Sequence, residues 1–210
     1  MGFRFLDPGP MIDGELELVA PEHRWVDALL AACAHPQSAD DPGALATTRE
    51  RVSDFLRVAP RGHQPADNGF SHVPSYHFWM KLSPVCAADL RGGPLPRWGE
   101  ATPPVQIAGG LSLRIGNNRD LEMYAGHIGY NVYPAARGHH YAERSCRMLF
   151  PLARAHGIRI LWITCNPDNW ASRRTCERLG CHLADIVPVP SDHPLYLRGD
   201  REKCRYWIAI

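Results

Sequence analysis

The sequence predicts an α/β fold, more closely an α+β arrangement in which helices cover the faces of a mixed sheet. Three observations predict this fold. Apolar and polar residues alternate in several segments, apolar residues recur at helical spacing in the segments between them, and turn-forming residues separate the two kinds. With 210 residues, the chain is expected to form one domain over residues 1–210.

The first 60 residues predict one strand followed by two helices. The segment "GELELVA" alternates apolar and polar residues and predicts a strand over 15–20. Pro21 suits the first position of a helix that extends to about residue 34. Asp41 and Pro42 begin a second predicted helix, which Pro60 ends.

Three further strands and a long loop are predicted in the middle of the chain. The strands are "SYHFWMKLS" (75–83), "VQIAGGLSLRI" (105–115) and "LEMYAGHIGYNVY" (121–133). Residues 84–104 are rich in Pro and Gly and predict a loop, in which Arg97 and Trp98 are placed to fold over a site.

The rest of the chain alternates helices and strands. The helix after residue 133 contains Pro151, which is expected to kink it or end it early. Gly180 is expected to stop the next helix. The predicted order after the first of these helices is a strand over 158–165, a helix over about 168–179, and strands near 182–189 and 203–210.

The composition argues against several classes of protein. Lys and Arg (23) nearly balance Asp and Glu (22), so the net charge of +1 gives no overall attraction to nucleic acid or acidic membranes. The seven cysteines form no CxxC pair, and no apolar run approaches the length of a membrane span. We therefore expect a cytoplasmic protein that binds neither nucleic acid, nor a membrane, nor a metal.

The junction between the strand 121–133 and its helix has the features of an anion site. A helix N-terminus presents unpaired N–H groups and the positive end of the helix dipole. The residues expected to form this turn are Arg137, Gly138, His139, His140, Tyr141 and Ala142. Because every strand-to-helix junction has such amides, this pattern alone does not identify a ligand.

Two motifs add a resemblance to a known family. "HIGYNVYPAARGHHYA" resembles the coenzyme-A-binding motif of the GNAT superfamily of N-acetyltransferases, where a strand leads into Arg/Gln-x-x-Gly-x-Gly/Ala and a helix. "CNPDNWASRRTCERLG" is similar to the superfamily's next motif, Asn-x-x-Asn ending in Leu-Gly. The resemblance covers about residues 73–210. It implies a GNAT-like acyl-CoA N-acyltransferase fold, with a cofactor-binding core at about 105–210 and acceptor-side elements at about 15–104.

The resemblance implies an acetyl-CoA-dependent N-acetyltransferase that moves an acetyl group directly to a primary amine. The acceptor, a small molecule or a peptide N-terminus, stays open, and a homodimer is possible. The alternative is a non-catalytic acyl-CoA-binding or sensing domain. Besides the phosphate-binding turn, the implied contacts to the pantetheine arm come from Tyr130, Val132, Tyr133, Asn166, Asn169 and Ser172. For the asparagines, helix capping is the other interpretation.

Two positions depart from the family pattern. His140 stands where the family usually has glycine. A first-turn helical residue needs no positive φ, so we expect an outward side chain that either donates to a phosphate or lies in solvent. Cys176 stands where many members carry the tyrosine thought to protonate the coenzyme A thiolate. It is a candidate acid, although a buried cysteine is commonly an inert small hydrophobe.

A base is needed because an alkylammonium of pKa about 10.4 is mostly protonated at neutral pH. His127 and Glu122 are the candidates on the strand 121–133. Strand alternation places His127 on the same face as Gly129, Asn131 and Tyr133. The other interpretation of His127 is a structural histidine within the sheet, and Glu122 lies close to a turn.

Overall fold

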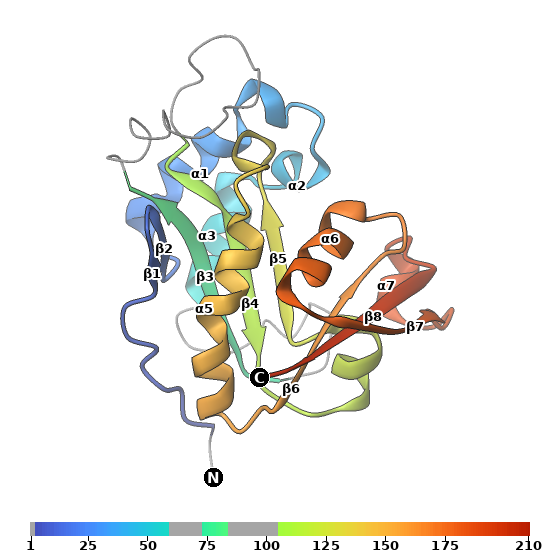
Figure 1. The fold of residues 1–210 in the computed structure, drawn as a ribbon. Helices are drawn as coiled ribbons and strands as arrows, with labels where there is room; N and C mark the ends of the chain where they lie inside the picture. The colour runs from blue at the N-terminus through green and yellow to red at the C-terminus, as the bar shows by residue number, and fades with distance from the viewer. Residues whose placement is uncertain (1–2, 59–72, 84–104) are drawn as a thin grey trace.

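The structure is a computed structural model that describes residues 3–58, 73–83 and 105–210, and its strands form two antiparallel sheets (Figure 1). Within these ranges the larger sheet has the order β1-β2-β3-β4-β5, and the smaller has the order β6-β8-β7. The strands are β1 (Ile12–Asp13), β2 (Leu16–Val19), β3 (Ser75–Leu82), β4 (Ile107–Arg114), β5 (Ile128–Val132), β6 (Ile160–Cys165), β7 (His182–Pro188) and β8 (Glu202–Ala209). The expected α/β fold is confirmed, with its strands divided between two sheets.

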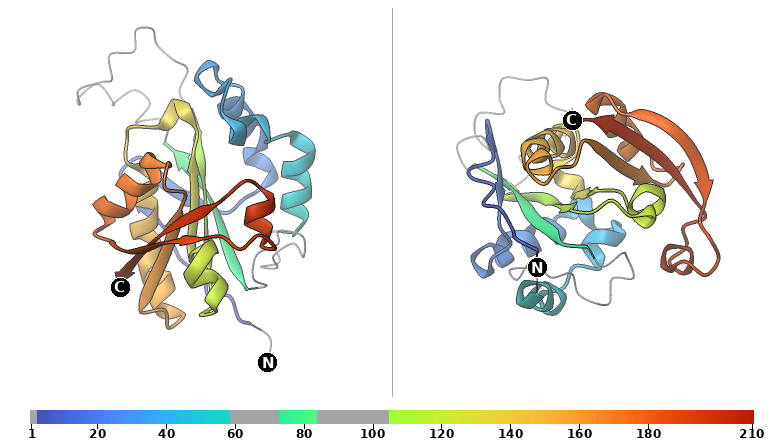
Figure 2. Two further views of the ribbon diagram at one scale, coloured as in Figure 1. Left: turned by 90° about the vertical axis from the view of Figure 1, so that its right-hand side faces the viewer. Right: turned by 90° about the horizontal axis from the view of Figure 1, so that it is seen from below.

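Helices cover both faces of the larger sheet, as the views of Figure 2 show. The helix α5 packs on one face, and α1 and α3 pack on the other. The described helical segments are η1 (His23–Trp25), α1 (Val26–Cys33), η2 (Pro36–Ser38), α2 (Pro42–Leu45), α3 (Arg49–Val58), η5 (Leu121–Ala125), η6 (Pro134–Ala136), α5 (Tyr141–Ala155), α6 (Trp170–Leu179) and α7 (Pro194–Leu197).

One buried cluster joins the two sheets. Leu16 of β2, Leu149 of α5 and Tyr206 of β8 belong to the same set of packed apolar side chains. A second cluster lies on the opposite face of the larger sheet, where Val26 of α1 and Trp79 of β3 pack together. The alternating strands expected from the sequence explain this division, because neighbouring residues of β3 point to opposite faces.

The two sheets meet at the start of β5 and β6. The amide of His127 donates to the carbonyl of Trp162 at 2.7 Å, and the Trp162 amide donates to His127 Nδ1 at 2.9 Å. Gly126 (φ 68°) allows this approach, since a Cβ there would lie 3.0 Å from the Thr164 amide nitrogen. Beyond this junction β5 and β6 diverge in Figure 1, and no ladder joins them within the described ranges. One edge of β5 is therefore left without a strand partner.

The strand predicted over 121–133 is shorter than expected. Residues 121–125 form the π-helical turn η5, and β5 begins only at Ile128. The side chain of Asn118 accepts a hydrogen bond from the Leu121 amide at 2.9 Å, which favours a helical turn, and Gly126 then reverses the chain direction. Local hydrogen bonding therefore overrides the alternating pattern of "LEMYAGHIGYNVY".

The helices also differ from the prediction at their boundaries. The first begins as the 3₁₀ turn η1 rather than at Pro21, and the second is split into α2 and α3. Near the split, the Thr47 hydroxyl donates to the Gly43 carbonyl at 2.7 Å, and the Thr48 hydroxyl accepts from the Arg51 amide at 3.3 Å. Pro151 does not end α5, which continues to Ala155. The short elements β1 and α7 were not predicted.

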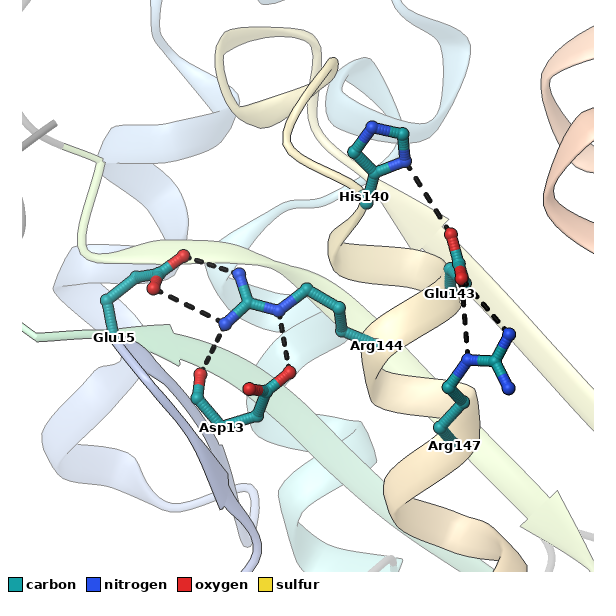
Figure 3. A network of polar contacts seen from close by, with 6 residues as sticks. All are labelled: Asp13, Glu15, His140, Glu143, Arg144 and Arg147. Atoms are coloured by element: carbon teal, nitrogen blue, oxygen red, sulfur yellow. Dashed lines mark hydrogen bonds and ion pairs between the residues drawn. The ribbon is translucent and has the colours of Figure 1, made fainter. Parts of the chain in front are cut away.

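An ion-pair network anchors the N-terminal hairpin to α5 (Figure 3). Arg144 Nε lies 2.7 Å from Asp13 Oδ2, and Arg144 Nη1 lies 2.5 Å from Glu15 Oε1. The guanidinium also donates to the Asp13 carbonyl. Hydrogen bonding to Arg144 holds the pKa of Glu15 below its ordinary value. This network fixes one side of the helix whose N-terminus forms the candidate site.

Arg144→Met is expected to lower the free energy of unfolding by about 1–3 kcal/mol, because partly buried Glu15 would lose its charged partner. Urea denaturation at neutral pH measures this loss. The loss should shrink as the pH falls below about 4.5, where Glu15 becomes protonated in the unfolded chain and then in the folded one. The control is Arg57→Met, whose exposed pair with Asp54 is worth less than about 0.5 kcal/mol. Equal losses in the two variants would contradict the anchoring role.

Candidate cofactor and acceptor site

The N-terminus of α5 lies at the end of β5, where the sequence predicted an anion site. No side chain caps this helix at its N-terminus. The first hydrogen bond of the helical ladder runs from the Arg144 amide to the His140 carbonyl at 3.0 Å, so the amides of Tyr141, Ala142 and Glu143 precede the ladder. Gly138 (φ 92°) supplies the turn that brings the chain to this point. The geometry matches the general requirement for phosphate binding at a helix N-terminus.

His140 occupies a left-handed backbone conformation, with φ 59° and ψ 19°. Among the described residues it is the only non-glycine residue with a positive φ. The expectation that this position needs no positive φ was therefore wrong, because His140 is the N-cap of α5 and not a residue inside the helix. A left-handed conformation costs a non-glycine residue about 1–2 kcal/mol, which is the physical reason why glycine suits this position.

The ring of His140 connects the two helices of the motifs. Its Nδ1 lies 2.8 Å from Arg178 Nη1 near the end of α6. The same nitrogen lies 3.6 Å from Glu143 Oε2, a contact shown in Figure 3. Since a guanidinium can only donate, Nδ1 accepts from Arg178 and the ring proton sits on Nε2. Glu143 is paired with Arg147 at 3.2 Å. These contacts direct the imidazole toward α6 and help to offset the backbone strain at His140.

Arg137 and His139 flank the same turn. Arg137 Nε donates to the Val132 carbonyl at 2.9 Å, and its Nη2 lies 2.6 Å from Asp41 Oδ2. Asp41 in turn caps α2 by accepting from the Ala44 amide at 3.0 Å. Arg137 therefore holds the turn before α5 against the start of α2, while the ring of His139 stacks on Tyr141.

Three residues at β5 were predicted to contact the pantetheine arm, but not all of their backbone amides point to the free edge of the strand. The Tyr133 amide donates to the Ala108 carbonyl at 2.8 Å and so points toward β4. By strand alternation, the N–H groups of Tyr130 and Val132 point to the opposite edge, toward the gap beside β6. The phenol of Tyr130 lies 2.9 Å from Ser172 Oγ of α6 and closes this gap on the side of the α5 core.

The two asparagines of the second motif have structural partners. Asn166 Nδ2 donates to Asp200 Oδ1 at 2.6 Å, and Asn166 Oδ1 accepts from the buried Lys203 ammonium at 2.6 Å. Asn169 Oδ1 accepts from the Ser172 amide at 3.0 Å and caps α6. This geometry favours the capping interpretation for Asn169 and a buried polar network for Asn166.

His127 is a buried residue at the junction of the sheets. Only 1% of it is exposed, its Nδ1 accepts from the Trp162 amide, and its Nε2 donates to the Gly116 carbonyl at 2.9 Å. Burial lowers the pKa of the imidazole below its ordinary value of 6.5. Both ring nitrogens are thus engaged, and the geometry favours the structural histidine over the base.

Glu122 and Cys176 also have surroundings that differ from those of a catalytic site. Glu122 belongs to the η5 turn, and its carbonyl accepts from Arg205 Nε at 2.9 Å. Cys176 is fully buried in α6, where a hydrogen bond to the Cys181 sulfur and burial raise the pKa of its thiol. A thiol that is harder to ionise is a poor proton donor, so the inert-hydrophobe interpretation of Cys176 is favoured.

Two adjoining cavities, of about 220 and 350 Å³, lie between α3 and the adjacent face of the larger sheet. They share Phe55, Trp79, Gly110 and Asn131. The smaller is otherwise lined by Leu29, Ala46, Thr47, Arg51, Val52 and Tyr133, and the larger by His77, Phe78, Leu111, Ser112, Arg114, Gly129 and Tyr130. This face of the sheet therefore carries cavities that are lined by both apolar and polar residues.

Sequence reasoning missed the polar residues of these cavities. No site residue was predicted on the strands that carry His77 and Arg114, although β3 pairs with β4 so that His77 lies opposite Ser112. Burial, with a contribution from the charge of Arg114, lowers the pKa of His77 to about 4. The alternation of β3 and β4 was the available signal, because it places both side chains on the face opposite α5. Arg97 and Trp98, expected above the site, lie outside the described residues.

The described residues contain neither a group of metal ligands nor a membrane-spanning helix. In residues 3–58, 73–83 and 105–210, no three His, Cys, Asp or Glu side chains are grouped so that they could hold a metal ion. Over the same ranges no helix is both long and apolar enough to cross a membrane.

His127→Ala is expected to reduce the free energy of unfolding by about 1–3 kcal/mol, because the buried Trp162 amide loses its acceptor. A histidine buried in its neutral form stabilises the fold above pH about 6.5 and loses this effect as the pH falls, so acidification should cost the variant less than wild type. Chemical denaturation from pH 7.5 to 5 tests both points, with exposed His23→Ala as control. Unchanged stability, combined with a lost ionisation in the kcat/KM profile, would instead identify a base.

His140→Gly is expected to be more stable than His140→Ala by about 1 kcal/mol. Both variants lose the imidazole contact with Arg178, and only alanine keeps the Cβ that opposes a positive φ. Thermal and urea unfolding of the two variants measure the difference. Equal stability would show that the backbone at residue 140 carries no strain.

Comparisons with known proteins find similarity to acetyltransferases in sequence and in fold. Residues 95–182 match the family model "Acetyltransferase (GNAT) domain", whereas no curated protein sequence matches the chain. Among solved structures, the microcin C7 self-immunity acetyltransferase MccE in complex with acetyl-CoA and AMP has 15% identity and a TM-score of 0.62. That match covers 94% of each chain.

Two further structures have the same fold. RimL, a ribosomal L7/L12 α-N-protein acetyltransferase in complex with coenzyme A, has 18% identity and a TM-score of 0.61 over 96% of this chain and 98% of its own. A ribosomal-protein-serine acetyltransferase structure from Vibrio cholerae has 11% identity and a TM-score of 0.61 over 98% and 100%. The chain therefore has the fold of these acetyltransferase structures, and residues 95–182 are similar to the GNAT acetyltransferase domain.

Proposed function

We propose that the protein is an acetyl-CoA-dependent N-acetyltransferase that uses acetyl-CoA as its acyl donor. The single observation that carries this proposal is the uncapped N-terminus of α5 directly beside the free edge of β5. Both elements lie within the segment that matches the acetyltransferase family model. In this proposal residues about 105–210 hold the donor, and residues about 15–104 form the acceptor side.

The phosphates of the donor are assigned to the N-terminus of α5. The amides of Tyr141, Ala142 and Glu143 precede the helical ladder, and the dipole of a 15-residue helix favours an anion at this end. Arg137 adds positive charge at the same turn, and its bond to Asp41 leaves other guanidinium donors for a phosphate. His139 and His140 border this cradle.

The pantetheine arm is assigned to the gap between β5 and β6. The outward amides of Tyr130 and Val132 offer it hydrogen bonds of the kind that an added strand would make. Ser172 lies across the gap, where its hydroxyl contacts the Tyr130 phenol. The amide of Tyr133 is not assigned to the arm, because it already pairs with the carbonyl of Ala108.

Transfer follows from this placement of the two substrates. The neutral amine forms a bond to the thioester carbonyl carbon while the carbon–sulfur bond breaks, and the coenzyme A thiolate departs. The proton lost by the amine passes to water, and the thiolate, with a pKa of about 8.5, leaves without a dedicated acid. In this proposal the described residues contribute chiefly by positioning, since both ring nitrogens of His127 are engaged and the thiol of Cys176 is buried.

The proposal also includes a cytoplasmic location and a homodimer. The described cysteines are all free thiols, which supports a reducing, cytoplasmic location. A homodimer is compatible with the exposed edge strand β7, whose residues are mostly exposed. Neither feature enters the assignment of the donor site.

Calorimetric titration of acetyl-CoA into the wild-type protein is expected to show binding, and Arg137→Ala is expected to weaken it about tenfold. The expected reason is the loss of one charge and of the link that orients the turn. Arg57→Ala, on the outer surface of α3, is the matched control and should bind as wild type does. Absence of binding by the wild type would refute the proposed function.

Thiol release in the presence of an amine panel separates the enzyme from its alternative. Release that depends on an added amine supports the acetyltransferase. Binding of acetyl-CoA without turnover of any amine would favour a non-catalytic acyl-CoA-binding domain.

A further inference from the structure

Two cysteines meet at the C-terminal end of α6. The helix ends at Gly180, which has a left-handed conformation (φ 85°). The Cys181 amide donates to the Cys176 carbonyl at 2.9 Å, and the Gly180 amide donates to the Glu177 carbonyl at 3.0 Å. These are the two hydrogen bonds of a Schellman motif, in which the side chains at the positions of Cys176 and Cys181 are commonly in contact. The end of the helix therefore brings the two thiols together.

The two thiols differ in exposure and in acidity. Cys176 is fully buried, whereas Cys181 is partly exposed. A hydrogen bond between the two sulfurs raises the pKa of Cys176 and lowers the pKa of Cys181, although burial opposes the second effect. Since the thiolate is the reactive form of cysteine, Cys181 is the nucleophile of the pair and Cys176 donates its S–H to it.

A positive charge from α5 acts on the same thiol. The guanidinium of Arg147 contributes to the lowered pKa of Cys181. Arg147 donates to the Arg178 carbonyl at 2.8 Å and also pairs with Glu143 at 3.2 Å, as Figure 3 shows for the second contact. Because Arg178 lies between the two cysteines in the sequence, this bond holds Arg147 beside the end of α6.

The other described cysteines lack this combination. Cys165 and Cys204 lie opposite each other on β6 and β8, but both are buried, and burial raises the pKa of each thiol. Burial also raises the pKa of Cys146 in α5 and of Cys33, which is partly exposed at the end of α1. Cys181 is thus the described cysteine that combines exposure with a stabilised thiolate.

We propose that Cys176 and Cys181 are a redox-active pair that forms a reversible disulfide when the protein meets a hydroperoxide such as hydrogen peroxide. The Cys181 thiolate attacks one peroxide oxygen, the O–O bond breaks, hydroxide leaves, and Cys181 becomes a sulfenic acid. The Cys176 sulfur then forms the S–S bond while the S–O bond breaks, and the thiol proton leaves with the oxygen as water.

The two thiols together lose two electrons in this sequence, and the peroxide gains them. Cys176 is a poor acid for coenzyme A, but it can still react with an oxidised neighbour that it touches. A dithiol reductant reverses the reaction, so in a reducing compartment the disulfide is transient. This inference goes beyond the proposed acetyltransferase function and does not depend on it.

Peptide mapping of the wild-type protein tests the disulfide without any substitution. The protein is treated with hydrogen peroxide, its remaining thiols are alkylated, and it is digested with trypsin without reduction. Cleavage after Arg174, Arg178 and Arg198 gives peptides 175–178 and 179–198, which a bond between Cys176 and Cys181 holds together. We expect this linked species to be the main oxidised product and to disappear with dithiothreitol.

The same map contains the outcomes that would overturn the inference. These are a main disulfide between Cys181 and Cys146, a main disulfide between Cys165 and Cys204, or oxidation of Cys181 to a sulfinic acid with no disulfide to Cys176. A protein that loses no thiol under peroxide would overturn it as well.

Alkylation of the reduced, native protein tests which thiol reacts first. Iodoacetamide is expected to label Cys181 about tenfold faster than Cys33, because the rate follows the fraction of thiolate. Cys33 is the matched comparison, since it is also partly exposed but burial raises its pKa. Equal labelling rates would contradict the assignment of Cys181 as the nucleophile.

Substitutions separate the two parts of the pair. In Cys176→Ala, peroxide is expected to leave Cys181 as a sulfenic acid that dimedone traps, because the second thiol is missing. In Cys181→Ala, the loss of the Cys176 thiol is expected to slow about tenfold or more. Cys33→Ala should form the disulfide as the wild type does.

The melting temperature of each variant shows whether it is folded, and the wild-type map decides the question where a variant is not. If Cys176 in folded Cys181→Ala is oxidised as fast as in the wild type, or if dimedone traps nothing on Cys181 in folded Cys176→Ala, the proposed sequence of steps is wrong.

Discussion

The contact between His127 and Trp162 is the constraint on which the rest of the structure depends. It joins the two sheets at one point, through a pair of hydrogen bonds of 2.7 and 2.9 Å, and beyond it β5 and β6 separate. Gly126 permits the close approach, and burial keeps the imidazole neutral so that Nδ1 can accept. If the two strands paired along their length, β5 would have no free edge. The proposed arm site therefore exists because this junction is short.

A second constraint acts at the N-terminus of α5. The chain turns between the end of β5 and the first amides of α5. This turn contains left-handed conformations at Gly138 and His140. His140 accepts the strain of a positive φ, and its ring gains a bond to Arg178 of α6. This contact couples α5 to α6. The turn before α5 is therefore held by Arg178 of α6 as well as by Arg137.

The face of the larger sheet that carries the two cavities is determined by the pairing of β3 with β4. Alternation divides these strands between the α5 core, which takes Tyr76 and Phe78, and the cavity side, which takes His77 and Trp79. Arg114 reaches the same cavity from the end of β4, where the missing side chain of Gly129 gives its guanidinium room. Polar side chains thus reach this face from two strands on which no site residue was predicted.

The sequence by itself determined the fold class, most of the order of elements, and the position of the turn and helix N-terminus that follow β5, because hydrophobic periodicity and motif spacing are local properties of the chain. The tertiary structure alone decided the roles of particular side chains. Whether His127 is a base or a structural histidine depends on the Trp162 amide, 35 residues away in sequence. The partners of Asn166 and Cys176, and the convergence of Arg51 and Arg114, arise from packing between distant segments. Periodicity carries no information about such contacts, since they depend on how the elements pack together.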